Sequence, residues 1–340
     1  MHSAVVSARS AVSPLDDVLF LLSHIDADAQ VRSRTGVGRG LKPSVNHSNG
    51  IVLAKMARTR PMARRGSAPG PKAPPLSRDG AAAAAVRCAA ARRRVISMSY
   101  NANSAHLGSS LGVVEILDAV LAVSDLRPAT ARAAERDRVI LSKGHAAMAY
   151  YAALEQYGLV DPALLDVYLQ NGTPLWGHVG LTETVPAIDA TSGSLGHGLS
   201  LAAGFSLGHR LRGGDHRVFC ILSDGECDEG ATWEAALFAG ARKLASLTAI
   251  VDYNHIQSLA PTREVMDLEP FGAKWRSFGF ETIELDGHDW AALVAALERP
   301  SRGRPRAILA HTVKGKGVAR IENTVASHYK PALAADLELA

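Results

Sequence analysis

Residues 218–257 read VFCILSDGECDEGATWEAALFAGARKLASLTAIVDYNHIQ. Two apolar runs in this stretch, VFCIL and LTAIV, are separated by a segment long enough for one helix. Each run is followed by residues that include side-chain oxygen ligands, first Asp224-Gly225 and then Asp252-Tyr253-Asn254. Continuous apolar runs that alternate with a helix are typical of parallel strands covered on both faces. The stretch therefore predicts a strand–helix–strand unit with polar side chains at both strand ends.

The same alternation extends in both directions along the chain. Apolar residues recur at helical spacing in 111–123 and 146–158, and the short apolar run RVIL predicts a further strand. Beyond the quoted stretch the expected order is helix, strand, helix, strand, ending at AILAHTV. This order predicts one α/β domain with a doubly wound parallel sheet over residues 81–335. The small-residue segment 196–213 is apolar on most faces and is expected to form a buried helix.

The net charge of +4 is unevenly distributed. Residues 1–97 hold 16 Lys and Arg against 5 Asp and no Glu, a balance of +11, while the remainder is at −7. Because the basic part lacks interleaved aromatic residues, the high isoelectric point does not indicate a nucleic-acid partner. Residues 1–80 are expected to be a disordered basic extension. An organellar address is one interpretation of it; an over-extended reading frame, starting at Met56 or Met62, is favoured.

Cysteine spacing and hydropathy bear on the compartment. Cys88, Cys220 and Cys227 form no C-x-x-C motif, so a structural zinc site is not expected, and a reducing cytoplasm is the expected location. No apolar run approaches the roughly 20 residues needed to span a bilayer, so no membrane partner is expected.

Asp224 and Asn254 lie 30 residues apart, which is the span of one strand–helix–strand unit. Ligands of open parallel sheets bind beyond the carboxyl ends of the strands. A carboxylate, an amide oxygen and a backbone carbonyl there form a hard oxygen site, of the kind that Mg²⁺ uses together with phosphate oxygens. Gly225 permits close approach of a phosphate, and residues 192–194 offer amide donors from a second loop. Either polar residue alone more often caps a helix or serves a turn, but the pair indicates a metal–phosphate site.

These residues, with several other blocks, resemble the transketolase family. SDGECDEG followed about 30 residues later by VDYNHIQ is similar to the family's thiamine diphosphate signature. Further blocks lie in the family's order: NANSAHLGSSLG, LSKGHAAMAYYAAL, GHVG, TSGSLGHGLSLAAG, ELDGHD, HTVKGKGV and a late His328. The resemblance covers residues 95–330. It implies the thiamine-diphosphate-binding fold of a diphosphate domain, with thiamine diphosphate and Mg²⁺, or another divalent cation, as cofactors.

The resemblance also implies individual roles for residues of the cofactor site. It makes Asp224, Asn254 and the backbone carbonyl of Ile256 the metal ligands. Glu229 is similar to the acid that the family carries at a subunit interface near the cofactor. The remaining cofactor-binding positions that the resemblance implies are Gly193, Ser194, Leu195, Gly225 and His145, with Asn254 shared with the metal.

Four histidines match the family's active-site set, and each lies in a polar loop flanked by Gly or Ser. The resemblance implies that His106 and His328 lie beside the reacting oxygen, and that His145 and His178 hold donor hydroxyls. One histidine in such a loop is usually structural or solvated. Four together suit ketol transfer, which needs groups that donate to sugar hydroxyls and move protons near neutral pH.

Two positions depart from the family pattern, and the roles of several others are left undecided. Ser223 replaces the first Gly of the signature, and His197 stands where many members carry Gln. Lys314 and Lys316 either contact phosphate or belong to a solvated loop. His288 is expected in a turn, and His311 near the crevice without a defined role.

The resemblance implies one subunit of a split enzyme. Transketolases carry a second α/β domain, whose Glu activates the cofactor, and no second apolar α/β series follows in this sequence. The expected partner is a C-terminal transketolase subunit with the pyrimidine domain, in an α2β2 assembly. The expected reaction transfers a two-carbon ketol unit between sugars or sugar phosphates. Alternatives are a deoxyxylulose-phosphate synthase-like or other thiamine diphosphate carboligase, and a non-catalytic cofactor-binding protein.

Overall fold

The computed structural model describes residues 78–339, and α2 (Arg78–Asn101) is the first helix among them. The predicted basic extension at 1–80 therefore lies outside the described residues, apart from its last three positions, which are helical. The predicted domain limits of 81–335 stay a prediction.

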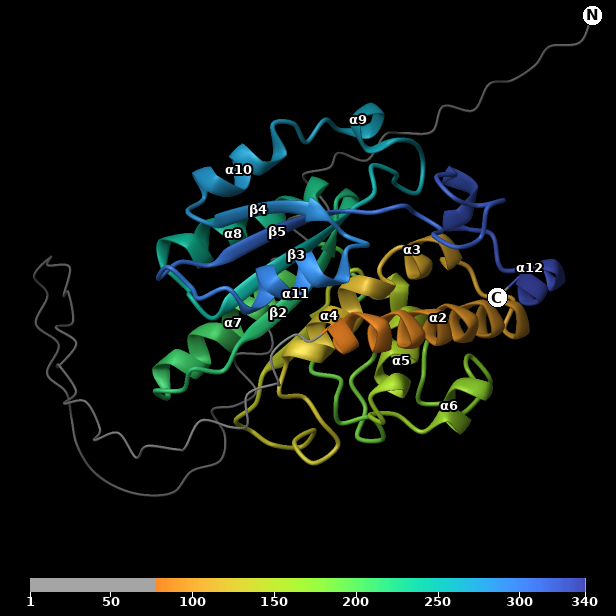
Figure 1. Cartoon of the computed structure of the whole chain (residues 1–340). Helices are drawn as coiled ribbons and strands as arrows, with labels where there is room; N and C mark the ends of the chain where they lie inside the picture. The colour runs from red at the N-terminus through yellow and green to blue at the C-terminus, as the bar shows by residue number, and fades with distance from the viewer. Residues whose placement is uncertain (1–77, 340) are drawn as a thin grey trace, which may run out of the picture. The chain divides into compact units, whose positions relative to one another are not determined.

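A parallel sheet of five strands forms the centre of the fold, as Figure 1 shows. In chain order the strands are β1 (Arg138–Leu141), β2 (Val218–Ser223), β3 (Leu247–Tyr253), β4 (Glu281–Asp286) and β5 (Arg306–His311). Their order in the sheet is β1-β2-β3-β5-β4, and every neighbouring pair is parallel. β2 and β3 are neighbours and are buried along their whole length, with Ser223 paired to Asp252. The predicted α/β fold with a parallel sheet is confirmed.

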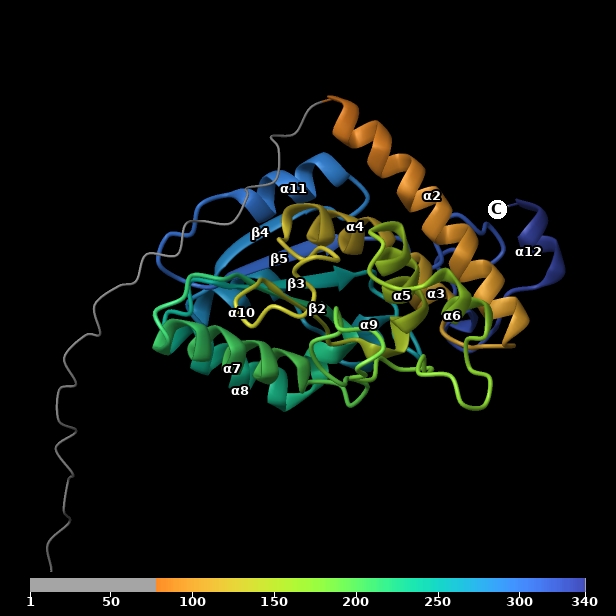
Figure 2. The same ribbon diagram turned by 90° about the horizontal axis from the view of Figure 1, so that it is seen from below.

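Helices cover both faces of this sheet, as the view in Figure 2 makes clear. α4 (Val114–Val123) and α11 (Trp290–Glu298) lie on one face, and α7 (Gly198–Leu211) and α8 (Gly230–Ala241) on the other. Two separate apolar clusters fill the layers on either side of the strands. Two-sided coverage explains why the strands read as continuous apolar runs.

Further helices and turns complete the domain. Their bounds are α3 (Leu107–Leu111), α5 (Ala147–Gln156), α6 (Pro162–Asp166), α9 (Thr262–Val265), α10 (Phe271–Ser277), α12 (Ala334–Leu339) and the 3-10 turns Gly144–Ala146, Gly225–Asp228 and Val325–His328. One of them, α10, packs against β4. Among the described residues, no helix has both the length and the apolar character to cross a membrane.

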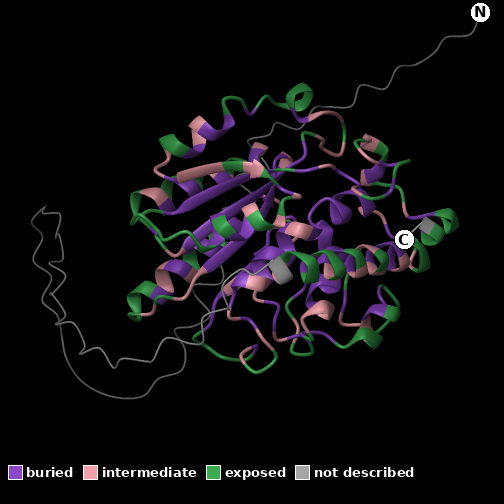
Figure 3. Cartoon of the chain, viewed as in Figure 1, coloured by how far each residue is buried: buried purple, intermediate pink, exposed green. Residues whose placement is uncertain are grey.

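The prediction that the 196–213 helix is buried was wrong for one of its faces. Leu201 is 43% exposed and Leu211 is 77% exposed, and Figure 3 marks exposed residues along α7. The face that does pack on the sheet is built from small residues such as Ala202 and Ala203, which are buried. Apolar composition on all sides of a helix therefore did not mean burial on all sides here.

Candidate functional site

The carboxyl ends of β2 and β3 meet at a cavity of about 220 Å³. Asp224 follows β2. One of its carboxylate oxygens accepts a hydrogen bond from the backbone N–H of Gly225, at 2.7 Å, and the other accepts one from the N–H of His255, at 2.6 Å. Asn254 follows β3, and its side-chain oxygen accepts the N–H of Ile256 at 3.1 Å. Asp224, Asn254 and Ile256 all line the cavity. The structure thus brings the three expected metal-binding residues together.

Asp224 is a buried carboxylate, and among the described residues no Lys or Arg forms an ion pair with it. Burial, followed by the charge of Asp252, raises the pKa of Asp224 to about 7. Asp252 differs because Lys143 forms a buried ion pair with it and Thr312 also donates to it. Burial works against ionisation of Asp252, but the Lys143 ammonium outweighs it and lowers the pKa of that carboxyl. The charge of Asp224 is therefore the one left for a ligand.

The oxygen donors around Asp224 fit a small divalent cation. A carboxylate, an amide oxygen and a backbone carbonyl are hard ligands, which suit Mg²⁺ when phosphate oxygens complete the shell. The carbonyl oxygen of Ile256 accepts a hydrogen bond from the Lys314 ammonium, with 2.9 Å between the nitrogen and the oxygen. This oxygen therefore already interacts with a positive charge at the cavity. Lys314 is almost fully buried, and burial lowers its pKa to about 8. Its ammonium lies where it could also contact an anion.

The loop at 192–197 forms another wall of the cavity. Gly193 and Leu195 line it, whereas Ser194 does not. Gly193 has φ of 144°, and a Cβ added there would lie 3.2 Å from the ring of His178. A Cβ on Gly225 would lie 2.9 Å from the side chain of Gln257. Both glycines therefore keep backbone accessible where a side chain would crowd the cavity wall.

The four predicted histidines come together at the same cavity. The ring of His106, at the start of α3, lies 5.3 Å from that of His145, 5.6 Å from that of His178 and 5.1 Å from that of His328. His145 and His328 are 5.3 Å apart. Four loops that are distant in sequence thus supply one cluster of imidazoles.

Burial keeps most of this cluster neutral. It lowers the pKa of His106 to about 4 and that of His328 to about 3, and it lowers the pKa of His145 well below its ordinary value. Neighbouring positive groups, Lys314 among them, act in the same direction. A neutral imidazole donates one hydrogen bond and accepts another, so the cluster can hold hydroxyl groups at neutral pH.

The cavity also includes residues for which no role was expected. These are Ser109, Lys143, Ser223, Gln257 and Ser258. Lys314, whose role was left open, also lines the cavity, whereas Lys316 does not. Ser109 and Lys143 lie inside the quoted blocks NANSAHLGSSLG and LSKGHAAMAYYAAL. This position within the family blocks is the sequence signal that could have identified them.

Three other residues discussed at the sequence level lie outside the cavity lining. Glu229 is exposed at the start of α8. His288 links two segments, since its ring contacts Glu115 at 3.0 Å and accepts the N–H of Val313 at 2.9 Å. His311 lies 3.7 Å from Glu284 at the end of β5.

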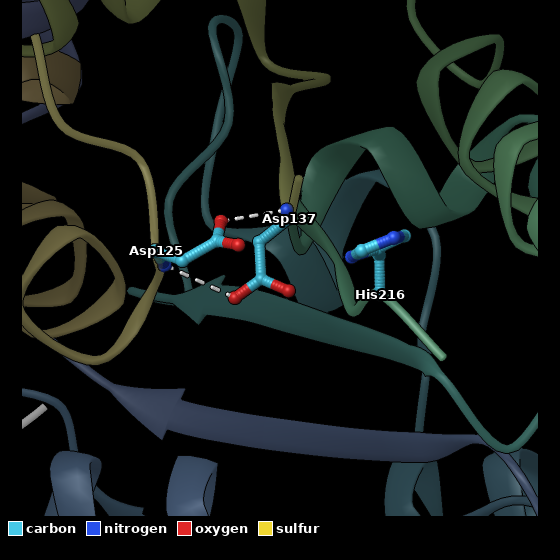
Figure 4. A group of neighbouring side chains, drawn as sticks. All are labelled: Asp125, Asp137 and His216. Carbon is cyan, nitrogen blue, oxygen red and sulfur yellow. Dashed lines mark hydrogen bonds between the residues drawn. The ribbon is translucent and has the colours of Figure 1, made fainter. Parts of the chain in front are cut away.

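A second group of possible metal ligands, Asp125, Asp137 and His216, lies elsewhere in the fold (Figure 4). Asp137 already accepts from the guanidinium of Arg217, at 2.6 and 3.0 Å, and from its backbone N–H at 2.7 Å. In addition, the backbone N–H of Asp125 donates to the carboxylate of Asp137, and the backbone N–H of Asp137 donates to the carboxylate of Asp125. These contacts make the group an ion-paired structural cluster.

The geometry can be compared with known proteins. Residues 84–340 match the family model described as the thiamine diphosphate binding domain of transketolase. The chain belongs to the transketolase family. The expected family, its thiamine diphosphate-binding domain and its fold are thereby confirmed.

Relatives within the transketolase family include single subunits and whole enzymes. The chain is 42% identical to the 6-deoxy-6-sulfo-D-fructose transketolase subunit SqwG of Clostridium sp. (strain MSTE9), over 66% of this chain and 82% of that one. It is 32% identical to an apulose-4-phosphate transketolase subunit from Phocaeicola vulgatus, over 70% of this chain and 85% of that one. Against the solved transketolase of Campylobacter jejuni the TM-score is 0.69 at 27% identity, and the match covers 75% of this chain but only 41% of that one.

Proposed function

We propose that this chain is the diphosphate-binding subunit of a two-subunit transketolase. The enzyme transfers a two-carbon ketol unit from a ketose, or ketose phosphate, to an aldose acceptor. The observation that carries the proposal is the single cavity in which the oxygen donors of Asp224, Asn254 and Ile256 meet four clustered histidines. Relatives named as transketolase subunits support it.

The cofactor half of the cavity is assigned to Mg²⁺ and the diphosphate. Asp224, Asn254 and the Ile256 carbonyl hold the cation, and its charge relieves the cost of an ionised, buried Asp224. The backbone at Gly193, Leu195 and Gly225 and the Lys314 ammonium face the diphosphate. Bound thiamine diphosphate supplies the electron sink that carbon–carbon bond cleavage requires.

The histidine half of the cavity is assigned to the sugar. His106 and His328 lie next to each other and both have lowered pKa values, so each is a neutral imidazole that can donate one hydrogen bond to a sugar oxygen and accept another. His145 and His178 flank His106 and can hold further hydroxyls of the donor.

A partner subunit with the pyrimidine domain completes the proposed enzyme, and an α2β2 assembly is the proposed stoichiometry. The exposed Glu229 is assigned to the contact with that partner, and Ser194 to the outer part of the cofactor loop. The names of the two subunit relatives specify a sulfonated ketose and a phosphorylated one, so we assign the substrate to the class of anionic ketoses. The three cysteines are all unpaired, which supports a reducing cytoplasm as the location.

Calorimetric titration of the purified chain with thiamine diphosphate tests this function. Binding is expected with MgCl₂ and is expected to be lost in EDTA. Asp224→Asn should weaken Mg²⁺-dependent binding about a hundredfold, because a charged ligand of the cation is replaced by a neutral one. Asp161→Asn, which changes an exposed cap of α6, is the control and should bind normally.

The alternatives give different results. Uptake of the cofactor with release of CO2 from pyruvate and transfer of its acetyl unit, and no ketol transfer from ketoses, would favour a deoxyxylulose-phosphate synthase-like enzyme. Absence of thiamine diphosphate binding with the partner present would contradict the proposal.

A further inference from the structure

One carboxylate next to the cavity is fully buried and yet does not line it. Glu226 directly follows Asp224-Gly225, has 0% exposure and has its side chain turned into the protein. Its Oε1 accepts the hydroxyl of Ser142 and the backbone N–H of Gly196, the latter at 2.9 Å. A buried carboxylate with two such donors is expensive to disturb, because removing it leaves both donors unsatisfied.

The same residue also closes the turn that carries Asp224. Ser223 Oγ accepts the N–H of Glu226 at 3.2 Å, and Glu226 Oε2 accepts the N–H of Ser223 at 3.4 Å. This reciprocal pair has the hydrogen-bond pattern of a capping box, in the S-x-x-E spacing of residues 223–226, although the N-cap of the turn itself is Asp224. Ser223 departs from the family signature. A glycine at this position would keep the backbone hydrogen bond to Glu226 but would lose the one that the Ser223 hydroxyl accepts.

These contacts join three separate walls of the cavity. Ser142 lies at the end of β1, next to Lys143, and Gly196 ends the loop that presents Gly193 and Leu195. Glu226 thus connects the β1 end and the 192–197 loop to the turn after β2.

The packing around this junction leaves little freedom. A Cβ on Gly198 would collide with the side chain of Ser142, and one on Gly196, where φ is 82°, would lie 2.8 Å from the Cβ of Glu229. The Ser142 hydroxyl and the Gly196 N–H therefore have little room to move towards other acceptors if the Glu226 carboxylate is removed. The β1 end is also held by β2, through the Ser142 N–H and the Ile221 carbonyl at 2.8 Å, whereas Glu226 links it to the 192–197 loop.

We propose that Glu226 is a positioning residue for the diphosphate, holding the 192–197 loop and the end of β1 at a fixed spacing from the turn of Asp224 and Gly225. It contacts neither cofactor nor metal and acts through the backbone at Gly196 and the turn at Ser223. This inference rests on the proposed function for the identity of the ligand, but the loop geometry can be measured without any ligand.

Two substitutions separate positioning from a general loss of stability. Glu226→Gln keeps one oxygen that can accept from both Ser142 and Gly196 and loses only the long 3.4 Å bond from the Ser223 N–H, whereas Glu226→Ala keeps no acceptor. Asp137→Asn is the matched control: Asp137 is also a buried, multiply bonded carboxylate, but it precedes β1 at the opposite end of the strand. Each full-length variant is compared by amide hydrogen exchange across 192–199 without ligand, and by its Kd for thiamine diphosphate at saturating Mg²⁺.

Glu226→Ala should abolish protection of the Gly196 amide and raise the Kd about tenfold or more, while Glu226→Gln should stay within about threefold of the wild type. Asp137→Asn should lower the thermal midpoint and leave both readouts unchanged. Unchanged exchange in Glu226→Ala, or equal Kd values for Ala, Gln and wild type, would overturn the inference. If the wild type bound no thiamine diphosphate even with the partner subunit present, the proposed function would fail, and the exchange data alone would decide whether Glu226 holds the loop.

Discussion

The imidazoles at the cavity are neutral because of where they lie. His106, His145 and His328 are partly or fully buried and face two ammonium groups, Lys143 and Lys314, which oppose any further positive charge. A proton added to one ring also meets the neighbouring rings at just over 5 Å. The cluster can therefore donate and accept hydrogen bonds without holding a permanent charge.

This arrangement predicts a pH dependence of stability. His106 is protonated in the unfolded chain below about pH 6.5, but in the folded protein only near pH 4. Between these values the unfolded chain binds more protons, so the free energy of unfolding falls as the pH drops. His106→Asn should reduce that fall between pH 6.5 and 4.5 by on the order of 1 kcal/mol, after allowing for solvent screening of a partly exposed ring.

Urea unfolding followed by circular dichroism, without metal, measures this difference. His197→Asn, at an exposed loop position, is the control. Identical pH profiles for His106→Asn and the wild type would show that His106 is not held neutral by its surroundings.

Lys314 and Lys316 form a natural pair for a second test, because they lie in one loop but only Lys314 lines the cavity. Lys314→Met should weaken thiamine diphosphate binding by about 10- to 100-fold, since a buried ammonium facing an anion is removed. Without cofactor the same variant should lose little stability. The Ile256 and Gln257 carbonyls lose a hydrogen-bond donor, but the cost of burying an ammonium that has no carboxylate partner among the described residues is also removed. Lys316→Met should leave both quantities unchanged, as titration calorimetry and urea unfolding can check. Equal effects of the two substitutions on binding would exclude the assigned role of Lys314.

At the scale of elements, the entry into α7 is the tightest contact near the cavity. A Cβ on Gly198 would collide with the Cβ and Oγ of Ser142 and lie 2.7 Å from its Cα, so β1 and α7 would have to move apart. Gly198→Ala should lower the free energy of unfolding by about 1–3 kcal/mol and weaken cofactor binding. Gly204 lies in the same helix, where a Cβ would meet no described atom within 4 Å, and Gly204→Ala should raise stability by about 0.5–1 kcal/mol. Denaturant unfolding of both variants checks the opposite signs, and a stable Gly198→Ala protein would disprove the close contact.

The elements themselves were largely predictable from the sequence. Strands such as β2 and β3 are buried on both faces, which produces the continuous apolar runs that mark them. The exposed side of α7 was not predictable, because Leu201 and Leu211 are apolar yet face away from the core. A sequence shows how apolar a helix is, but not whether another layer covers it.

For the whole molecule, the proposed partner leads to a prediction about activity. The purified chain should transfer no ketol unit, and addition of a pyrimidine-domain subunit should produce activity together with a heterotetramer. A coupled assay with an anionic ketose donor and analytical ultracentrifugation of the mixture measure the two outcomes. Robust transfer by this chain without a partner would refute the split-enzyme proposal.

The candidate site was predictable to a lesser degree than the fold. The meeting of Asp224 and Asn254 followed from strand topology alone, since consecutive parallel strands end at one edge. The histidines come from four loops, and only family resemblance related His106 to His328. Lys143 has no periodic signal, and its burial depends on the charge of Asp252, which lies more than 100 positions away. Glu226 did have a local signal in the S-x-x-E spacing, but that spacing does not indicate its distant partners, Ser142 and Gly196.

The buried ion pair between Lys143 and Asp252 has a consequence for how the cation and the diphosphate bind together. Since these two charges cancel, the floor of the cavity presents one anion, Asp224, and one cation, Lys314, and is close to electroneutral. A bare divalent ion would leave an excess of positive charge there, and an uncomplexed pyrophosphate group would leave an excess of negative charge. Each should therefore raise the affinity of the other, and by thermodynamic reciprocity by the same factor, so that loading is cooperative.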